Sequence, residues 1–277
     1  MKQIYIIAKE FKYPLLLIYT YMFIAQLLFL LEPYVLGKMI DGLLKNDYNW
    51  LYCFLGIMVF ENYFIYRRMV YDTKVYTTIY NSVVLKFLKN SKDSDNSTKI
   101  ARTELTNNLI NFLENDIHYY IMAIITLVGS LIFIFLEHPM TGFVSMACVI
   151  PISFIVYHFY KKISQSTRVN HTHYEDKISI ITEGDDDKIE SFFNRRRKIM
   201  IYGSTLQGKN WVSLIGTRVS FLVLSLIVFT HNNTNLSQGD SIAMYAYINQ
   251  FLFSLMSIPV GVETFTRIKD VLNRITE

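Results

Sequence analysis

The stretch of this sequence closest to a catalytic motif is Gly203-Ser-Thr-Leu-Gln-Gly-Lys-Asn210. It nearly matches the G-x-x-x-x-G-K-[ST] loop, in which backbone N–H groups cradle phosphates and the final hydroxyl binds Mg²⁺. Asn210 replaces that hydroxyl, and the segment leads directly into an apolar stretch, whereas the motif lies between a strand and a helix. We therefore interpret these residues as a flexible hinge, and we expect no enzymatic activity from this chain.

The cysteines and histidines form no pattern typical of a metal site. Cys53 and Cys148 lie in separate apolar segments, so they predict neither a disulfide nor a pair of metal ligands. His171 and His173 are two residues apart in a polar stretch, which is more typical of a solvated loop than of metal ligation. We expect no metal and no other cofactor on this chain.

Ionisable and polar side chains within apolar segments are the strongest candidates for function, because they are costly in a membrane and usually face a cavity or a partner. Glu61 and Arg218 have similar expected depths, which is compatible with an ion pair or with one shared water-filled pathway. Alternatively, Arg218 reaches toward the inner membrane surface. Gln26, Asn249 and Gln250 are further pathway candidates, although hydrogen bonds between helices explain them equally well.

The composition indicates an all-α membrane protein. Of 277 residues, 52% are hydrophobic and only 18% are charged, which is unusually apolar for a soluble domain. A run of about 18 or more apolar residues can cross the hydrocarbon core as a helix. The sequence predicts six such transmembrane helices, with boundaries at about 13–32, 50–68, 118–137, 139–160, 211–230 and 241–262.

The distribution of basic residues predicts the orientation of these spans. With both termini in the cytoplasm, 24 lysines and arginines fall in cytoplasmic segments and two in external loops, as the positive-inside rule requires. Topology then explains the net charge of +4, and no nucleic-acid partner is expected. Residues 1–12 are predicted to form an amphipathic elbow at the membrane surface, and 263–277 a cytoplasmic C-terminal helix. We expect a multi-pass protein of a bacterial inner membrane.

Two long polar connections are predicted to be cytoplasmic helical hairpins. They cover residues 67–117 and 161–210, and each has recurring apolar positions among mixed charges. At 1.5 Å per residue, each is long enough for two helical extensions of ~20 residues. The turns are predicted at 90–98, where helix breakers cluster, and at 183–187, where acidic residues suit the start of a helix. The external connections, at about 33–49, 137–138 and 231–240, are shorter.

Three short motifs, with the order of spans and hairpins, resemble one known family. They are Glu32-Pro-Tyr-Val-Leu-Gly-Lys-Met-Ile-Asp-Gly42 at the outer end of the first span, Gln238-Gly239-Asp240 before the sixth, and Phe265-Thr-Arg-Ile-Lys-Asp-Val-Leu272 after it. In these features nearly the whole chain resembles the six-helix transmembrane domain of ABC exporters. The resemblance implies a homodimer that encloses the pathway, with the turns as coupling helices that contact an ATPase. The coupling-helix candidates are Asp95, Thr98, Ile100, Glu183, Gly184, Asp185 and Ile189.

The resemblance predicts a permease subunit that moves its substrate by alternating access. The chain ends at Glu277, where the family's nucleotide-binding domain would begin, so we expect a separate ATPase subunit to bind and hydrolyse ATP with Mg²⁺. One alternative is a carrier of the same fold that is driven by an ion gradient, with Glu61 as its proton site. Another is a regulatory membrane protein without transport activity. A voltage-gated channel is disfavoured because no span carries repeated arginines.

Overall fold

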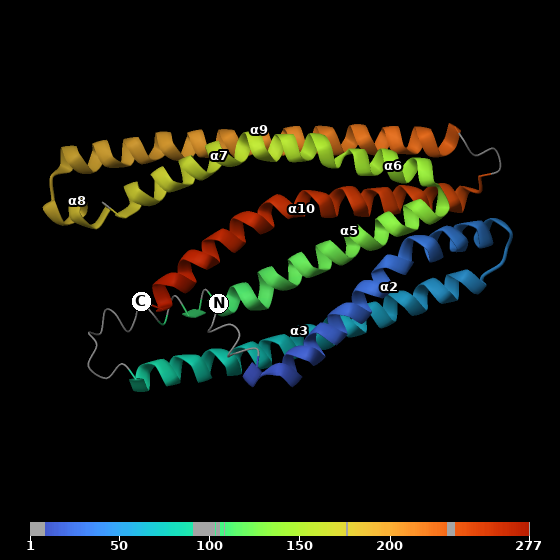
Figure 1. The fold of residues 1–277 in the computed structure, drawn as a ribbon, viewed down its shortest axis with the longest axis horizontal. Helices are drawn as coiled ribbons and strands as arrows, with labels where there is room; N and C mark the ends of the chain where they lie inside the picture. Colours follow the sequence, from blue (N-terminus) through green and yellow to red (C-terminus); the bar gives the residue numbers. More distant parts are fainter. Residues whose placement is uncertain are drawn as a thin grey trace. The chain divides into compact units, whose positions relative to one another are not determined.

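The computed structural model describes residues 9–90, 103, 106–107, 109–175, 177–231 and 236–276, and within these residues it contains helices and no strand (Figure 1). The predicted all-helical class is therefore confirmed for this part of the chain. η1 is a π-helix, and the others are α-helices. The elements are α2 (Lys12–Leu44), α3 (Asn49–Asn90), η1 (Phe112–Asp116), α5 (Ile117–Glu137), α6 (Pro139–Ala147), α7 (Val149–Glu175), α8 (Lys177–Glu183), α9 (Asp186–His231) and α10 (Gln238–Thr276).

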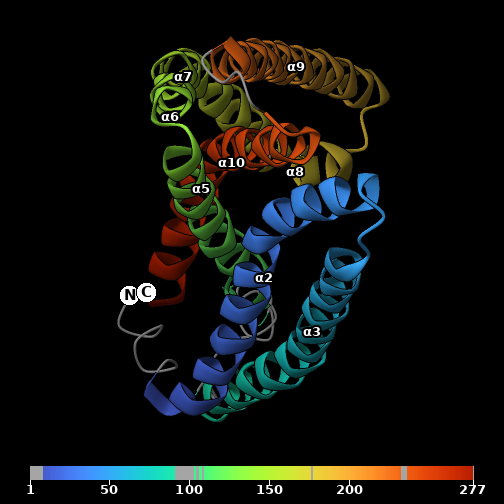
Figure 2. The same ribbon diagram turned by 90° about the vertical axis from the view of Figure 1, so that its right-hand side faces the viewer.

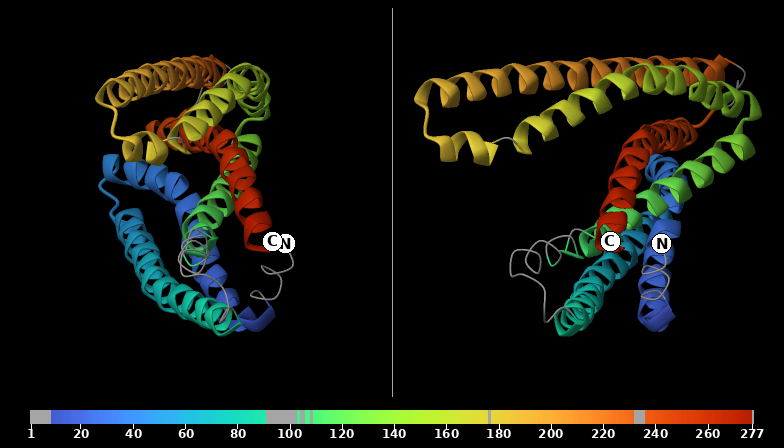
Figure 3. Two further views of the ribbon diagram at one scale, coloured as in Figure 1. Left: turned by 90° about the vertical axis from the view of Figure 1, so that its left-hand side faces the viewer. Right: turned by 60° about the vertical axis from the view of Figure 1, so that its left-hand side comes forward.

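The described helices form two compact units, one from residues 1–142 and 226–277 and the other from residues 143–225. In the first unit, α2 packs along α3 and contacts α5 and α10, while α10 packs along α5 (Figures 1 and 2). In the second unit, α7 and α9 run in opposite directions and are joined through α8 (Figure 3). A hydrogen bond of 3.0 Å between the hydroxyls of Ser145 and Ser225 ties the α6 and α9 segments of this unit together.

Helix α2 is longer than predicted. The connection predicted at 33–49 is helical as far as Leu44, and only residues 45–48 form the turn to α3. Pro33 lies inside α2, where its missing N–H leaves the carbonyl of Phe29 without its usual helical donor. The side-chain amide of Gln250 on α10 donates a long hydrogen bond of 3.5 Å to that carbonyl. The neighbouring helix thus compensates for the proline, and α2 continues past the point where the sequence predicts its end.

The hinge predicted at Gly203–Asn210 is wrong, because α9 is an unbroken helix from Asp186 to His231. Gly203 faces the neighbouring helix closely: a Cβ there would lie 3.1 Å from the Ser166 hydroxyl. The glycine therefore serves helix packing, and a phosphate-binding loop is excluded at this position because the residues are helical.

Among the described residues, four helical segments are long and apolar enough to cross a membrane: Lys12–Leu44, Leu109–Glu137, Pro139–Ile163 and Asp186–His231. They contain four of the six predicted spans. The spans predicted at 50–68 and 241–262 lie on the long helices α3 and α10. α3 continues well past its predicted span, and α10 continues through the predicted C-terminal helix as far as Thr276.

Some predictions fall outside the described residues. These are most of the N-terminal elbow, the first hairpin turn, and the coupling-helix candidates Asp95, Thr98 and Ile100.

Candidate transport pathway

Two glycines bring α2 and α10 into direct contact at the end of these helices that the charge pattern predicts to be external. A Cβ on Gly37 would lie 2.6 Å from the carbonyl oxygen of Gly239, and a Cβ on Gly239 only 2.0 Å from the carbonyl oxygen of Gly37. Cβ atoms are not found at such distances from backbone atoms. Glycine at both positions therefore allows the two backbones to approach this closely.

Charged side chains fix the start of α10 beside these glycines. The carboxylate of Asp41 accepts a hydrogen bond of 2.9 Å from the backbone N–H of Gly239, and Lys38 forms a 3.3 Å ion pair with Asp240. The hydroxyl of Ser237 accepts a hydrogen bond from the N–H of Asp240 and so caps the helix. We call the contact formed by Gly37, Lys38, Asp41, Gly239 and Asp240 the outer seam.

The ionised form of Asp240 is favoured by this environment. Burial raises the pKa of the carboxyl, but hydrogen bonds from Ser237 and Lys38 and the charge of Lys38 outweigh it, so the pKa of Asp240 lies below its usual value. The Lys38–Asp240 pair is consequently charged at neutral pH. Both side chains are more than one-third exposed, so the pair contributes little to stability by itself, and the glycine contact carries more of the packing.

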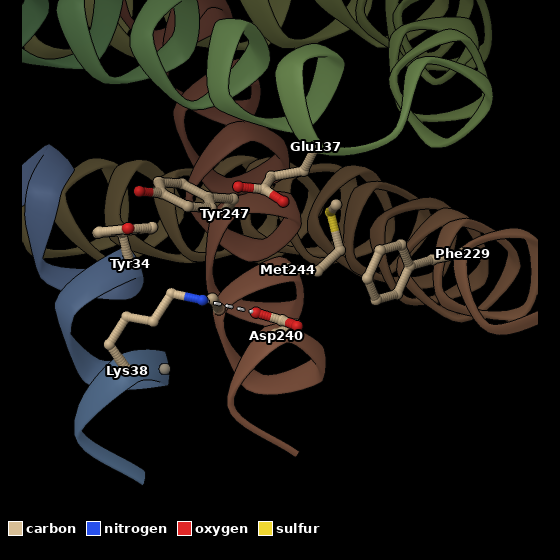
Figure 4. Close-up of a pocket in the computed structure, with 9 residues that line it drawn as sticks. Tyr34, Lys38, Glu137, Phe229, Asp240, Met244 and Tyr247 are labelled. Atoms are coloured by element: carbon tan, nitrogen blue, oxygen red, sulfur yellow. Dashed lines mark hydrogen bonds and ion pairs between the residues drawn. The ribbon is translucent and has the colours of Figure 1, made fainter. Parts of the chain in front are cut away.

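A small cavity lies against the outer seam. Its volume is about 20 Å³, which is room for about one water molecule. Lys38 reaches across it to Asp240, and Tyr34, Glu137 and Tyr247 line it as well (Figure 4). The hydroxyl of Tyr247 donates a 3.1 Å hydrogen bond to the carbonyl of Leu30 and so adds a link between α10 and α2. At this contact, α2 and α10 leave space for no more than about one water molecule.

The structure places two of the predicted pathway residues in contacts between helices. Gln26 is buried, and its amide donates a 2.6 Å hydrogen bond to the hydroxyl of Thr126 on α5. The amide of Gln250 on α10 donates to the backbone carbonyl of Phe29. Phe29 lies about one helical turn beyond Gln26 on α2. Neighbouring turns of α2 are thus tied to α5 and to α10. This agrees with the alternative interpretation of these residues as hydrogen-bonding contacts between helices.

The remaining pathway candidates are only partly buried. Glu61 on α3 lies close enough to Glu32 of α2 for their carboxylates to interact electrostatically. Asn249 lies on α10 in the same unit, whereas Arg218 lies on α9 in the unit of residues 143–225. An ion pair between Glu61 and Arg218 therefore stays a prediction.

The second predicted turn is present between α8 and α9. Gly184 has φ +70°, a conformation that favours glycine. Asp185 caps α9 by accepting hydrogen bonds of 3.1 and 3.2 Å from the N–H groups of Asp187 and Lys188. Lys188 also forms an ion pair with Glu183, and the hydrogen bond that its ammonium group donates to this carboxylate raises the pKa of Lys188. Residues 183–188 are all exposed, so the turn presents a fixed charged surface.

Replacing Asp185 by alanine is expected to cost the start of α9 about 1 kcal/mol, because two N–H groups lose their acceptor. Amide hydrogen exchange at Asp187 and Lys188 should become about five-fold faster. Asp186→Ala removes the same charge one residue further along and is the control. Equal acceleration in both variants would show that charge, and not capping, holds the turn.

The outer seam could not be recognised from the sequence. Its residues belong to two separate motifs, and Lys38 and Asp240 are 202 positions apart in the sequence. The glycines within both motifs were the available signal, because small residues allow close contacts between membrane helices.

The long apolar helices and the polar ties between them define an integral membrane protein. The chain belongs to the ABC transporter transmembrane region family, because that family's model matches residues 4–239. The resemblance noted from the sequence motifs is thereby confirmed, and the protein is a component of membrane transport. No curated protein gives a significant match to the chain.

Proposed function

We propose that this chain is the permease subunit of a dimeric ABC-type exporter with six transmembrane helices per subunit. An ATPase outside these 277 residues supplies the energy, and the substrate moves by alternating access. The outer seam is the observation that carries this proposal. It closes the predicted external end of α2 and α10 through a small set of contacts, which a conformational change can break without unfolding either helix.

The second hairpin provides the route from an ATPase to the membrane. At 1.5 Å per residue, α9 extends about 38 Å from the turn at Gly184 to Trp211, the predicted inner membrane boundary, without a break. A continuous helix transmits a displacement of its end better than a hinged one. In this proposal, the charged turn of residues 183–188 contacts the ATPase, and movement of the hairpin opens and closes the pathway.

Purification tests the partnership directly. The tagged chain, extracted from its native membrane in mild detergent, is expected to bring ATPase activity with it. Glu183→Lys should reduce the recovered activity, because it reverses a charge on the exposed turn. Asp47→Lys, at the turn between α2 and α3, is the matched control and should leave the recovery unchanged. If no ATPase is recovered and the purified chain transports with a pH gradient alone, the proposal is wrong.

The interaction of Glu61 with Glu32 favours one second candidate, a carrier driven by a proton gradient. Two neighbouring carboxylates can share a proton, as proton-coupled transport requires. For that mechanism, Glu61→Gln should abolish gradient-driven uptake into liposomes that contain only this chain. Transport that persists in Glu61→Gln and requires ATP would exclude it.

A further inference from the structure

A second polar cluster is buried in the unit of residues 1–142 and 226–277, away from the outer seam. Asp72 of α3 is 5% exposed and His118 of α5 is 2% exposed. The rings of Tyr19 and Tyr76 pack against the His118 ring, with centroids 5.3 and 5.9 Å away. The phenol groups of these tyrosines are hydrogen-bonded to each other. Three helices, α2, α3 and α5, therefore enclose the cluster.

The basic residue of the cluster only partly satisfies Asp72. Arg68 places its Nε 3.4 Å from Oδ2 of Asp72, an ion pair without a well-formed hydrogen bond, and it directs Nη1 to the sulfur of Met122, a weak acceptor. Oδ1 of Asp72 is buried and has no hydrogen-bond partner. A buried carboxylate oxygen without a donor is costly.

His118 presents a second buried acceptor. Its Nδ1 is hydrogen-bonded to the backbone carbonyl of Glu114, so Nδ1 carries the proton and Nε2 of the neutral ring is an acceptor. Nε2 is also buried and has no partner. Glu114 belongs to the π-helix η1, an irregular turn of a kind often found at functional sites. Two lone-pair acceptors in one enclosed cluster thus lack a donor.

We propose that Asp72 and His118 form a proton-binding site between α2, α3 and α5. A proton taken up by Asp72 removes its buried negative charge and turns one carboxylate oxygen into a hydrogen-bond donor, so the cluster no longer holds an unpaired charged acceptor. Within the described part of the chain, the other titratable and charged groups that interact with Asp72 are Arg68, Glu114, Tyr19 and Tyr76. The site is distinct from the outer seam and from Glu61, and it requires neither an ATPase nor a substrate.

Burial and the neighbouring charges set the pH range in which Asp72 takes up or releases a proton. Burial raises the pKa of Asp72 to about 6; the positive charge of Arg68 opposes this shift and the carboxylate of Glu114 adds to it. A raised folded-state pKa means that the protonated form stabilises the fold. This contribution is fully present below the usual pKa of an aspartate and is lost as pH rises through about 6. Acidification should therefore stabilise the folded form of this unit.

Infrared titration of the whole chain in lipid nanodiscs, with ¹³C-labelled aspartate, tests the site. A protonated aspartate band should disappear with a midpoint near 6 as pH rises. The band should be absent in Asp72→Asn and retained in Asp116→Asn, the matched control two residues from His118. His118→Gln should shift the midpoint, since it changes the other acceptor. If the wild type shows no such band, or if Asp72→Asn retains it, the proposal is wrong.

Thermal unfolding gives an independent result. The wild-type Tm should fall between about pH 5 and about pH 8, and Asp72→Asn should lose most of this dependence because an amide mimics the protonated carboxyl. A purely structural role predicts an equal decrease in Tm at both pH values, and that result would overturn the proposal. If Asp72→Asn does not fold, the wild-type titration and its shift in His118→Gln decide the question.

Discussion

Gly239→Val is expected to hold the outer seam open and to abolish transport. A Cβ at this position would lie 2.0 Å from the carbonyl oxygen of Gly37 and 2.7 Å from the carboxylate of Asp41. The first of these is a backbone atom that cannot rotate away, so the start of α10 must move away from α2. Overpacking of this kind costs about 1–3 kcal/mol, and the loss of the Asp41 hydrogen bond adds about 1.5–3 kcal/mol.

A cysteine on α10 reports this opening. Ala243→Cys places a thiol on the wall of the cavity, in a Cys53→Ser background that removes the exposed native cysteine. Labelling by a membrane-impermeant thiol reagent from outside should increase strongly in Gly239→Val. Gly56→Val is the matched control, because a Cβ at Gly56 meets nothing within 4 Å. Unchanged labelling in Gly239→Val would show that the seam opens and closes independently of the glycine contact.

The local features of the fold could be predicted from the sequence because local patterns determine them. The break between Glu137 and His138 is confirmed: α5 ends at Glu137, and His138 is extended with φ −153°. The turn predicted at 183–187 is likewise present at Gly184 and Asp185. Two polar residues between apolar segments mark the first position, and a glycine followed by a capping residue marks the second. Each signal lies within a few residues of the break that it predicts.

Two errors have a common cause, which is that tertiary contacts override local signals. Pro33 normally indicates a helix end, but Gln250 and Tyr247 of α10 hydrogen-bond the carbonyls before it, and α2 continues. Gly203 suggested a hinge, but it lies against Ser166 and α9 is unbroken. In each case the compensating residue is far away in sequence. Hydropathy and helix propensity carry no information about it.

The buried polar cluster could not be recognised from the sequence for a different reason. Asp72 and Arg68 fall in a segment predicted to be a solvated cytoplasmic helix, where an acidic and a basic residue four positions apart are ordinary. Only the packing of α2, α3 and η1 shows that Asp72 is 5% exposed. Gln26 shows the opposite case. It is a conspicuous polar residue within an apolar span, yet in the structure its amide simply hydrogen-bonds Thr126 of the neighbouring helix.

Gln250→Leu is expected to destabilise the contact between α2 and α10, and Pro33→Ala to cancel that effect. Leucine cannot donate to the carbonyl of Phe29, which Pro33 already leaves without a helical donor. An unpaired carbonyl costs about 1–3 kcal/mol, partly offset here because Oε1 of Gln250 is itself buried without a partner. Alanine at position 33 restores the N–H that completes the helix, so Phe29 no longer needs Gln250.

A double-mutant cycle on thermal unfolding measures the coupling between Pro33 and Gln250. The effect of the unpaired Oε1 of Gln250 is the same in both backgrounds, so it cancels in the cycle. The cost of Gln250→Leu should be about 1 kcal/mol smaller in the Pro33→Ala background than in the wild type, a difference of about 2–4 °C in Tm. Asn249→Leu, one position away on α10, is the control and should show the same cost in both backgrounds. Additive effects of Pro33→Ala and Gln250→Leu would mean that Phe29 obtains its donor elsewhere. The length of α2 would then depend on the packing of its side chains and not on α10.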